Sequence, residues 1–443
     1  MFPMRLVKAC VLVGCSLLAF FDLGCSSSLP ATEAPVTTST AKPEAICVEV
    51  TPNVLQFSYD PVRISWAVES PRTGDKIEIS LKDTPSFVMF RVVLDHINNT
   101  DNEYEIRPVN PRGGGYIVKY VKSDGSELCS THLAFAQGDD EPNQAHITVV
   151  GEDQLQVNWV SASSQPGEVL YQTVDGTNWI SHKETTNPRT YKGSDMCGIP
   201  AKDTGFRHPG YFHSVTFPNI PPFSTVKIRT GNATSKTYTP SPRLPAGDPT
   251  GHTVFLVGDL GTTGAGMGGG AEGFGTLEFP PPAAGHVMSR HNDRKISLGI
   301  IYGDISYAGG FTTVWDQYGD EFSNNGGMNH PTVMSVGNHE PMYFPCPKGG
   351  LEDQVADMLK SDVAPLLEKH HVDLYVSGHI HRYGRFLDYD CHYKTAFPFE
   401  KEVLMKGYLE LQVVNRSELR GVFWGYNDSV NQFTLIDSFL LAK

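Results

Sequence analysis

Four apolar segments of the chain each end in a glycine that is followed by a residue able to bind a metal ion. They are residues 253–257 before GDLG, 296–302 before GDISYAGG, 332–336 before GNHE, and 372–377 before GHIHRYGR. Each segment is rich in β-branched and aromatic residues, which predicts a buried strand. In open α/β sheets, ligands bind outside the carboxyl ends of the strands. One Gly-Asp pair is usually a turn, but four such units predict a sheet whose strand ends line one pocket.

The last unit places two histidines, His379 and His381, just after Gly378. Imidazole is the commonest metal ligand, and glycine lets the backbone turn so that two rings can approach one site. Taken alone, the pattern favours one surface histidine and one hydrogen-bonded histidine at a strand end. The three other units shift the interpretation towards metal binding.

The ordered set GDLG, GDISYAGG, GNHE and GHIHRYGR resembles the purple acid phosphatases of the calcineurin-like metallophosphoesterase superfamily. The resemblance covers nearly everything after the N-terminal leader and extends to the closing segments 407–414, 419–425 and 433–441, with an N-x-S/T-x-L-R element at 415–420. It implies a four-layer α/β metallophosphoesterase domain at residues 252–443, in the larger form of the family with N-terminal β domains.

The same resemblance implies two metal ions bridged by Asp304, since an aspartate can bind one cation through each oxygen. One metal would be held by Asp259, Asp304, Tyr307 and His381, and the other by Asp304, Asn338 and His379. The family pairs Fe(III), which suits a tyrosinate ligand, with a divalent Zn, Mn or Fe ion. Two such metals activate water and hold phosphate oxygens. The implied reaction is hydrolysis of a small phosphate monoester by a metal-bound hydroxide.

His339, next to Asn338, matches the family position of the acid that protonates the leaving alcohol. Its alternative role is a hydrogen-bonding residue behind the metal ligand. Trp315 and Asp316 belong to a WDQY stretch that the family also carries, and we expect them to pack behind the site.

The chain departs from the family between residues 340 and 351, where members carry further strands and a V-x-x-H or G-H-R-P-type motif. The histidine of that motif completes the second metal site in the family. His370 and His371 stand at the other end of the following strand and are not expected to replace it. Three protein ligands plus water are an acceptable catalytic set. The alternative function is therefore a catalytically impaired variant that acts as a non-enzymatic secreted binding protein.

Short alternating runs separated by turn clusters predict two β domains before the catalytic domain. Residues 46–140 are expected to form a β-sandwich, and residues 141–245 a fibronectin-type-III-like domain. Segments 144–171 and 196–220 are similar to the N-terminal part of the larger purple acid phosphatases. Both domains are interpreted as scaffolds that wall one side of the site or support a homodimer.

The first 25 residues have the basic start and short apolar run of a secretory signal peptide, with an uncleaved anchor as the alternative. Residues 26–45 form a Ser/Thr/Pro-rich spacer, and no later segment is long and apolar enough to span a membrane. The mature protein is therefore expected to be secreted. A formal net charge of −14 argues against nucleic acid as a partner.

The cysteines and glycosylation sequons fit an exported protein. Five cysteines follow the leader: Cys47, Cys129, Cys197, Cys346 and Cys391. Connectivity cannot be deduced from a sequence, but we expect Cys47 to pair with Cys129 and Cys346 with Cys391. The Asn-X-Ser/Thr sequons, each a possible glycan site, are at Asn98, Asn232, Asn415 and Asn427.

Overall fold

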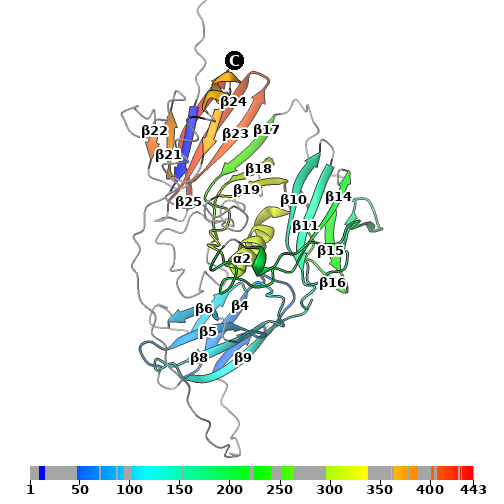
Figure 1. Ribbon diagram of the computed structural model, residues 1–443, viewed down its shortest axis with the longest axis vertical. Helices are drawn as coiled ribbons and strands as arrows, with labels where there is room; N and C mark the ends of the chain where they lie inside the picture. Colours follow the sequence, from blue (N-terminus) through cyan, green and yellow to red (C-terminus); the bar gives the residue numbers. More distant parts are fainter. Residues whose placement is uncertain are drawn as a thin grey trace, which may run out of the picture.

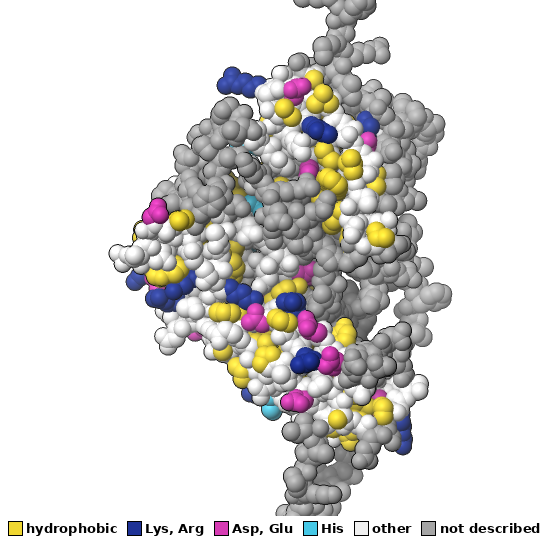
Figure 2. All heavy atoms as spheres, turned by 180° about the vertical axis from the view of Figure 1, so that it is seen from behind, with side chains coloured by type: hydrophobic (Ala, Val, Ile, Leu, Met, Phe, Trp, Pro, Cys, Tyr) yellow, Lys and Arg dark blue, Asp and Glu magenta, His cyan; other side chains and the backbone are white. Residues whose placement is uncertain are grey.

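The computed structural model describes residues 9–14, 47–68, 71–85, 88–93, 102–151, 154–196, 198–218, 224–240, 251–262, 296–337, 361, 364–370, 372, 374–377, 380–386, 401–403, 407–427, 430 and 432–442. They form two N-terminal β units and a C-terminal unit, which meet around helix α2 (Figure 1). On the face shown in Figure 2, acidic and basic side chains are interspersed over the described part, without a continuous basic patch.

The first β unit consists of two sheets that enclose one core. Its strands are β2 (Val48–Thr51), β3 (Val54–Leu55), β4 (Val62–Trp66), β5 (Lys76–Leu81), β6 (Val88–Val93), β7 (Glu103–Ile106), β8 (Tyr116–Val121) and β9 (Glu127–Phe135). The sheet orders are β2-β4-β7 and β3-β9-β8-β5-β6. Ile64 from the first sheet and Ile79 and Tyr120 from the second belong to the same buried cluster. The alternating sequence pattern thus supplies one apolar face per sheet.

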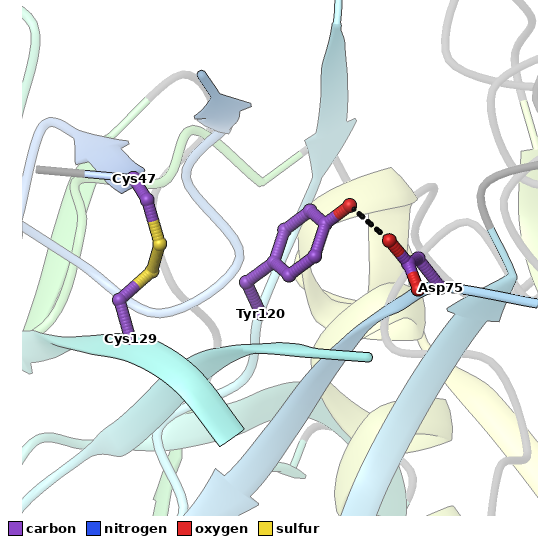
Figure 3. Close-up of a disulfide and its surroundings, with 4 residues drawn as sticks. All are labelled: Cys47, Asp75, Tyr120 and Cys129. Carbon is purple, nitrogen blue, oxygen red and sulfur yellow. Dashed lines mark hydrogen bonds between the residues drawn. A yellow bond between two sulfur atoms is a disulfide. The ribbon is translucent and has the colours of Figure 1, made fainter. Parts of the chain in front are cut away.

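A disulfide joins the two sheets of this unit, from Cys47 before β2 to Cys129 in β9, with their Cα atoms 6.2 Å apart (Figure 3). The predicted pairing of these two cysteines is confirmed. Close to it, the Tyr120 hydroxyl donates a 2.8 Å hydrogen bond to Asp75 Oδ2. The expected bridge from Cys346 to Cys391, and Cys197, lie outside the described residues.

The second β unit also has two sheets around one core. Its strands are β10 (Asn143–Gly151), β11 (Gln154–Ser161), β12 (Glu168–Gln172), β13 (Ile180–Lys183), β14 (Tyr211–Pro218), β15 (Thr225–Thr230) and β16 (Ala233–Thr234), with a 3-10 turn η2 (Gly193–Asp195). The sheet orders are β10-β11-β14 and β13-β12-β15-β16. Trp159, 1% exposed, belongs to one buried cluster with Val157 and Val215 of the first sheet and Val226 of the second.

The C-terminal unit is built on a six-stranded sheet in the order β19-β18-β17-β23-β24-β25. Its elements are β17 (His252–Val257), β18 (Ile296–Tyr302), α2 (Thr312–Phe322), η3 (Ser323–Gly327), β19 (Thr332–Ser335), α4 (Ala364–Lys369), β20 (Leu374–Ser377), β21 (Ile380–Phe386), β22 (Lys401–Val403), β23 (Gly407–Asn415), β24 (Glu418–Asn427) and β25 (Gln432–Ala442). Strands β17, β18 and β19 run parallel in this sheet, in agreement with the prediction for the first three ligand-bearing units. The strand of the fourth unit, β20, belongs to a smaller sheet, so the prediction of a single sheet for all four units is wrong.

The two faces of the six-stranded sheet carry different layers. On one face, Phe255 and Val257 pack with Tyr318 and Phe322 of α2. On the other, Leu256 packs with residues of the smaller sheet, including Tyr383 of β21. Because successive strand residues point to opposite faces, the apolar run of β17 buries both of its sides.

The smaller sheet has the order β20-β1-β21-β22, and β1 (Ala9–Gly14) belongs to the expected leader. Its backbone lies parallel to β20 and antiparallel to β21. A short run rich in valine and leucine suits a buried strand as well as the apolar part of a signal peptide. Removal of the leader stays a prediction, and residues 15–46, with the expected spacer, lie outside the described residues. No helix among the described residues has the length and apolarity needed to cross a membrane.

Helix α2 carries a buried carboxylate that both N-terminal β units contact. Asp320 is 2% exposed and accepts hydrogen bonds from the Gln144 N–H, at 2.7 Å, and from the Ser58 hydroxyl. Glu141, equally buried, accepts from the Ser58 N–H at 2.7 Å and from Asn110 Nδ2 at 2.8 Å. The carboxylates therefore join the three units through hydrogen bonds, in addition to apolar contacts such as that of Met328 with the core of the second β unit.

Burial raises the pKa of Asp320 to about 6 and the pKa of Glu141 to about 7, while the hydrogen bonds that each accepts act the other way. Asp320 interacts electrostatically with Asp316 and Arg112, and Glu141 with Asp320 and Lys236. An acid whose pKa is higher in the folded than in the unfolded protein stabilises the fold most below its unfolded pKa. That contribution is lost as the pH rises through the folded pKa.

We predict that Asp320→Asn removes this titration, since the new amide can donate to the Ser58 hydroxyl and still accept from the Gln144 N–H. The stability advantage of the wild type over this variant should fall as the pH rises from about 4 to about 7. Urea unfolding at several pH values measures it. Asp124→Asn is the control: hydrogen bonds from Ser126 lower the pKa of exposed Asp124, so the stability advantage of the wild type over this variant should not fall as the pH rises. An advantage of the wild type over Asp320→Asn that grows with pH would contradict the prediction.

Candidate metal centre

The loops that follow β17 and β18 stay paired beyond the ends of the two strands. The N–H of Asp259 donates to Gly303 O at 3.0 Å, and the N–H of Leu260 donates to Asp304 O at 3.0 Å. A third bond joins the Gly261 N–H to Ile305 O at 2.9 Å. The backbone thus places Asp259 and Asp304, the first two predicted ligands, side by side at the carboxyl edge of the sheet.

Three predicted ligands share an unusual backbone conformation. Asp259, Asp304 and Tyr307 have φ angles of 56°, 42° and 56°, in the left-handed region that residues other than glycine seldom adopt. Such residues cost about 1–3 kcal/mol each and persist where the surrounding structure enforces them, often at functional sites. Here the backbone hydrogen bonds between the two loops hold the two aspartates in this conformation.

The side chains of these three residues are buried at the strand ends, and two of them are hydrogen-bonded to each other. Asp259, Asp304 and Tyr307 are 4%, 3% and 9% exposed, and the Tyr307 hydroxyl donates to Asp259 Oδ1 at 3.3 Å. A buried carboxylate is stable only when it is hydrogen-bonded, paired or bound to a metal. Carboxylate and phenolate oxygens are hard donors, which suits Fe(III) and divalent ions. These residues therefore fit the metals that the family resemblance implies.

The end of the third parallel strand approaches the same loop. A Cβ atom added at Gly337 would lie 2.2 Å from Asp304 N and 2.3 Å from Asp304 Oδ1. The glycine of the GNHE unit is therefore required by the close approach of its backbone to Asp304. The three parallel strand ends meet at one point, as the sequence predicts.

The remaining predicted site residues are not tested. Asn338, His339 and His379 lie outside the described residues. The backbone of His381 lies in β21, which begins at Ile380, so this histidine belongs to a strand and not to a loop beyond a strand tip. Among the described residues, no cluster of three or more His, Cys, Asp or Glu suited to a metal occurs; of the predicted ligands of these types, only Asp259 and Asp304 have described side chains.

The second β unit contacts the segment next to the candidate centre, a position compatible with its expected role as a scaffold that walls one side of the site. The N–H of Thr312, at the start of α2, donates to Gly205 O at 3.0 Å, and a Cβ at Gly205 would lie 2.4 Å from Gly310 O. Ala201 packs in a small cluster with Trp315 of α2. This loop therefore contacts the segment that connects Tyr307 to α2, a contact that no sequence motif marked.

A serine, a histidine and a glutamate in the second β unit are arranged like a catalytic triad. His213 lies 2.9 Å from Glu184 Oε2 and 3.0 Å from Ser161 Oγ. However, Ser161 is 0% and His213 is 2% exposed, and Glu184 also accepts from two backbone N–H groups, of Gly167 and Ser214. A substrate cannot reach this serine, so the group is structural.

We predict that Gly337→Ala weakens metal binding by about tenfold or more, since the added methyl group displaces the Asp304 carboxylate and small changes next to ligands have effects of this size. Titration of the metal-free protein with Zn²⁺ and Fe ions, followed by metal analysis, measures the change. Gly198→Ala is the matched control, because a Cβ there meets no atom within 4 Å. Equal metal affinity of the two variants would contradict the prediction.

Comparison with known proteins agrees with the sequence motifs. A family model described as the purple acid phosphatase N-terminal domain matches residues 142–242. The chain is 26% identical over 197 residues to probable inactive purple acid phosphatase 27 of Arabidopsis thaliana, which covers 42% of this chain and 31% of the relative. It is 25% identical over 235 residues to probable purple acid phosphatase 20 of the same plant, covering 52% of this chain and 46% of the relative.

Among solved structures, a purple acid phosphatase from yellow lupin seeds matches with a TM-score of 0.63 at 16% identity, covering 89% of this chain and 95% of that chain. At this identity the likeness concerns the fold. The chain spans about a third of the length of the first curated relatives that it matches, 31% in each of two cases. The family model, the curated relatives and the shared fold together identify the purple acid phosphatases as the proteins that this chain is similar to.

Proposed function

We propose that the protein is a secreted acid phosphatase that hydrolyses small phosphate monoesters at a centre of Fe(III) and a divalent Zn, Mn or Fe ion. The observation that carries the proposal is the meeting of Asp259, Asp304 and Tyr307 at neighbouring parallel strand ends. When bound, the metal pair would activate water and neutralise phosphate charge. Asp304 would contact both metals, Asp259, Tyr307 and His381 would hold one, and Asn338 and His379 the other.

His339 completes the proposal as the acid that gives a proton to the leaving alcohol. A phosphate ester suits a site whose positive charge comes from metals, because the chain itself has a net charge of −14. Acidic and basic side chains are interspersed on the face shown in Figure 2, which supports the expectation of no nucleic-acid partner.

Export, glycosylation and a homodimer remain part of the proposal. Asn232 is exposed in the turn between β15 and β16, and Asn415 is exposed at the end of β23. In Asn415-Arg416-Ser417, the Ser417 hydroxyl donates to Asn415 Oδ1 at 3.0 Å. Both asparagines can therefore receive a glycan. We also propose that the second β unit is fibronectin-type-III-like and that the C-terminal unit has the four-layer arrangement of metallophosphoesterases.

A second candidate function is a non-enzymatic secreted binding protein. Two observations favour it: the sequence lacks the family's histidine motif between residues 340 and 351, and several matched relatives are named probable inactive purple acid phosphatases. Loss of one histidine alone leaves an acceptable ligand set. Loss of the neighbouring strands would remove groups that position phosphate, which is the stronger argument for inactivity.

Asp304→Asn tests the proposed function, because the variant loses one of the charged oxygens that would bridge the metals. We expect hydrolysis of p-nitrophenyl phosphate by metal-reconstituted protein to fall by about 100-fold or more, together with the bound metal. Asp124→Asn, in an exposed turn of the first β unit, is the matched control.

Unchanged hydrolysis in Asp304→Asn would refute the two-metal mechanism. Wild-type protein that binds metal but hydrolyses no phosphate ester would favour the binding-protein function. Restoring a segment with the missing histidine motif should then create activity where the original chain has none.

A further inference from the structure

Helix α2 is the direct continuation of the loop that carries the candidate ligands. It starts at Thr312, shortly after Tyr307, and the Phe311 N–H bonds to Ala308 O at 2.8 Å within the connection. The helix packs on the sheet through Tyr318 and Phe322. A displacement of α2 relative to the sheet would therefore move residues 304–307.

The face of α2 that points away from the sheet is held by the two N-terminal β units. Arg112 Nη2 of the first β unit donates to both carboxylate oxygens of Asp316, at 2.6 and 2.7 Å. Gln144 of the second β unit donates to Asp316 Oδ1 through Nε2 at 2.8 Å and to Asp320 Oδ1 through its N–H at 2.7 Å. Asp316 and Asp320 are one helical turn apart, so they present one acidic edge to both units.

This contact is buried. The side chains of Arg112 and Asp316 are 3% and 6% exposed. Removing one partner of a buried ion pair leaves the other uncompensated, which is strongly destabilising locally. By contrast, the ion pair of Arg63 with Glu103 in the same β unit is 57% and 39% exposed at 3.4 Å, where such a pair contributes little.

The backbone on both sides is adapted to this contact. Arg112 and Gln144 have φ angles of 55° and 59°, again left-handed for residues other than glycine. A Cβ at Gly319 of α2 would lie 2.6 Å from the Gln144 side chain, and a Cβ at Gly210 would lie 2.9 Å from Arg112 Nε. Glycines thus make room for both side chains. A contact that only held the units near one another would require neither the left-handed backbone of Arg112 and Gln144 nor their close approach to glycines.

We propose that Arg112 and Gln144 are positioning residues for the metal centre: they fix α2 through Asp316 and Asp320 and thereby hold the loop of Asp304 and Tyr307 in place. The N-terminal β units are then required for the geometry of the site. The proposal rests on the proposed function for the identity of the site, but the position of the loop can be measured without metal or substrate.

Two backbone amides report on the loop directly. The N–H groups of Leu260 and Gly261 bond to Asp304 O and Ile305 O, so their hydrogen exchange measures how often the ligand loop separates from its neighbour. Amides of β8 report on the core of the first β unit. Comparing exchange at these two sets of amides distinguishes local opening of the ligand loop from unfolding of the first β unit.

The experiment compares Arg112→Ala with the control Arg63→Ala in the full-length, metal-free protein. We expect hydrogen exchange at Leu260 and Gly261 to become about tenfold faster or more in Arg112→Ala, because the contact of Arg112 with α2 opposes local opening of the loop. Exchange of the β8 amides in this variant, and all exchange rates in Arg63→Ala, should stay at the wild-type values. A second variant, Gln144→Gly, removes the side-chain contact to Asp316 while glycine accepts the left-handed backbone, so this variant introduces no new strain.

Exchange at Leu260 and Gly261 that stays at the wild-type rate in Gln144→Gly and in folded Arg112→Ala would overturn the proposal. If Arg112→Ala unfolds the first β unit, exchange in Gln144→Gly alone decides: faster exchange supports the proposal and unchanged exchange refutes it. Absence of phosphatase activity in the wild type would refute the proposed function and leave this result intact. Metal content of each variant after reconstitution is a second readout, which should fall with faster loop exchange.

Discussion

The backbone pairing of two loops beyond the ends of β17 and β18 is the constraint on which the candidate site depends. Three consecutive hydrogen bonds, from Asp259, Leu260 and Gly261 to residues 303–305, extend the parallel ladder past the strands. They bring the backbones of two aspartates together, and both aspartates have left-handed φ angles. The two buried aspartates are therefore fixed next to each other through their backbones.

The rest of the molecule supports this constraint from two sides. From within the sheet, Gly337 allows the third parallel strand end to touch Asp304. From outside, the N-terminal β units hold α2 by hydrogen bonds to its carboxylates, and a loop of the second unit contacts the start of the helix. Such polar contacts depend on geometry more strictly than apolar packing does, so they suit the positioning of a neighbouring site.

The sequence predicts much of the strand framework because short apolar runs with turn residues at both ends are strong local signals. Predicted strands 296–302 and 62–66 coincide with β18 and β4, and the predicted pairing of Cys47 with Cys129 is present. Asp259 and Asp304 were predicted from the order of strand, glycine and ligand, and Tyr307 from the family resemblance. The structure pairs the loops of the two aspartates and hydrogen-bonds Tyr307 to Asp259.

Other features depend on contacts that a sequence does not display. Arg112 and Asp316 are 204 residues apart, and nothing near either residue marks it as the other's partner. The left-handed backbone of Gln144 also has no local signal, because it follows from packing against Gly319. Likewise, the apolar run of the leader gives a strand in the smaller sheet, since strand and signal peptide share a composition.

Metal content, measured with a visible absorption spectrum on the same purified protein, tests the central claim most directly. Two metal ions per chain and a tyrosinate-to-iron absorption band are the predicted result, because Asp259, Asp304 and Tyr307 would then hold a complete pair with the remaining ligands. One metal ion or none, without that band, would contradict the account of a two-metal phosphatase.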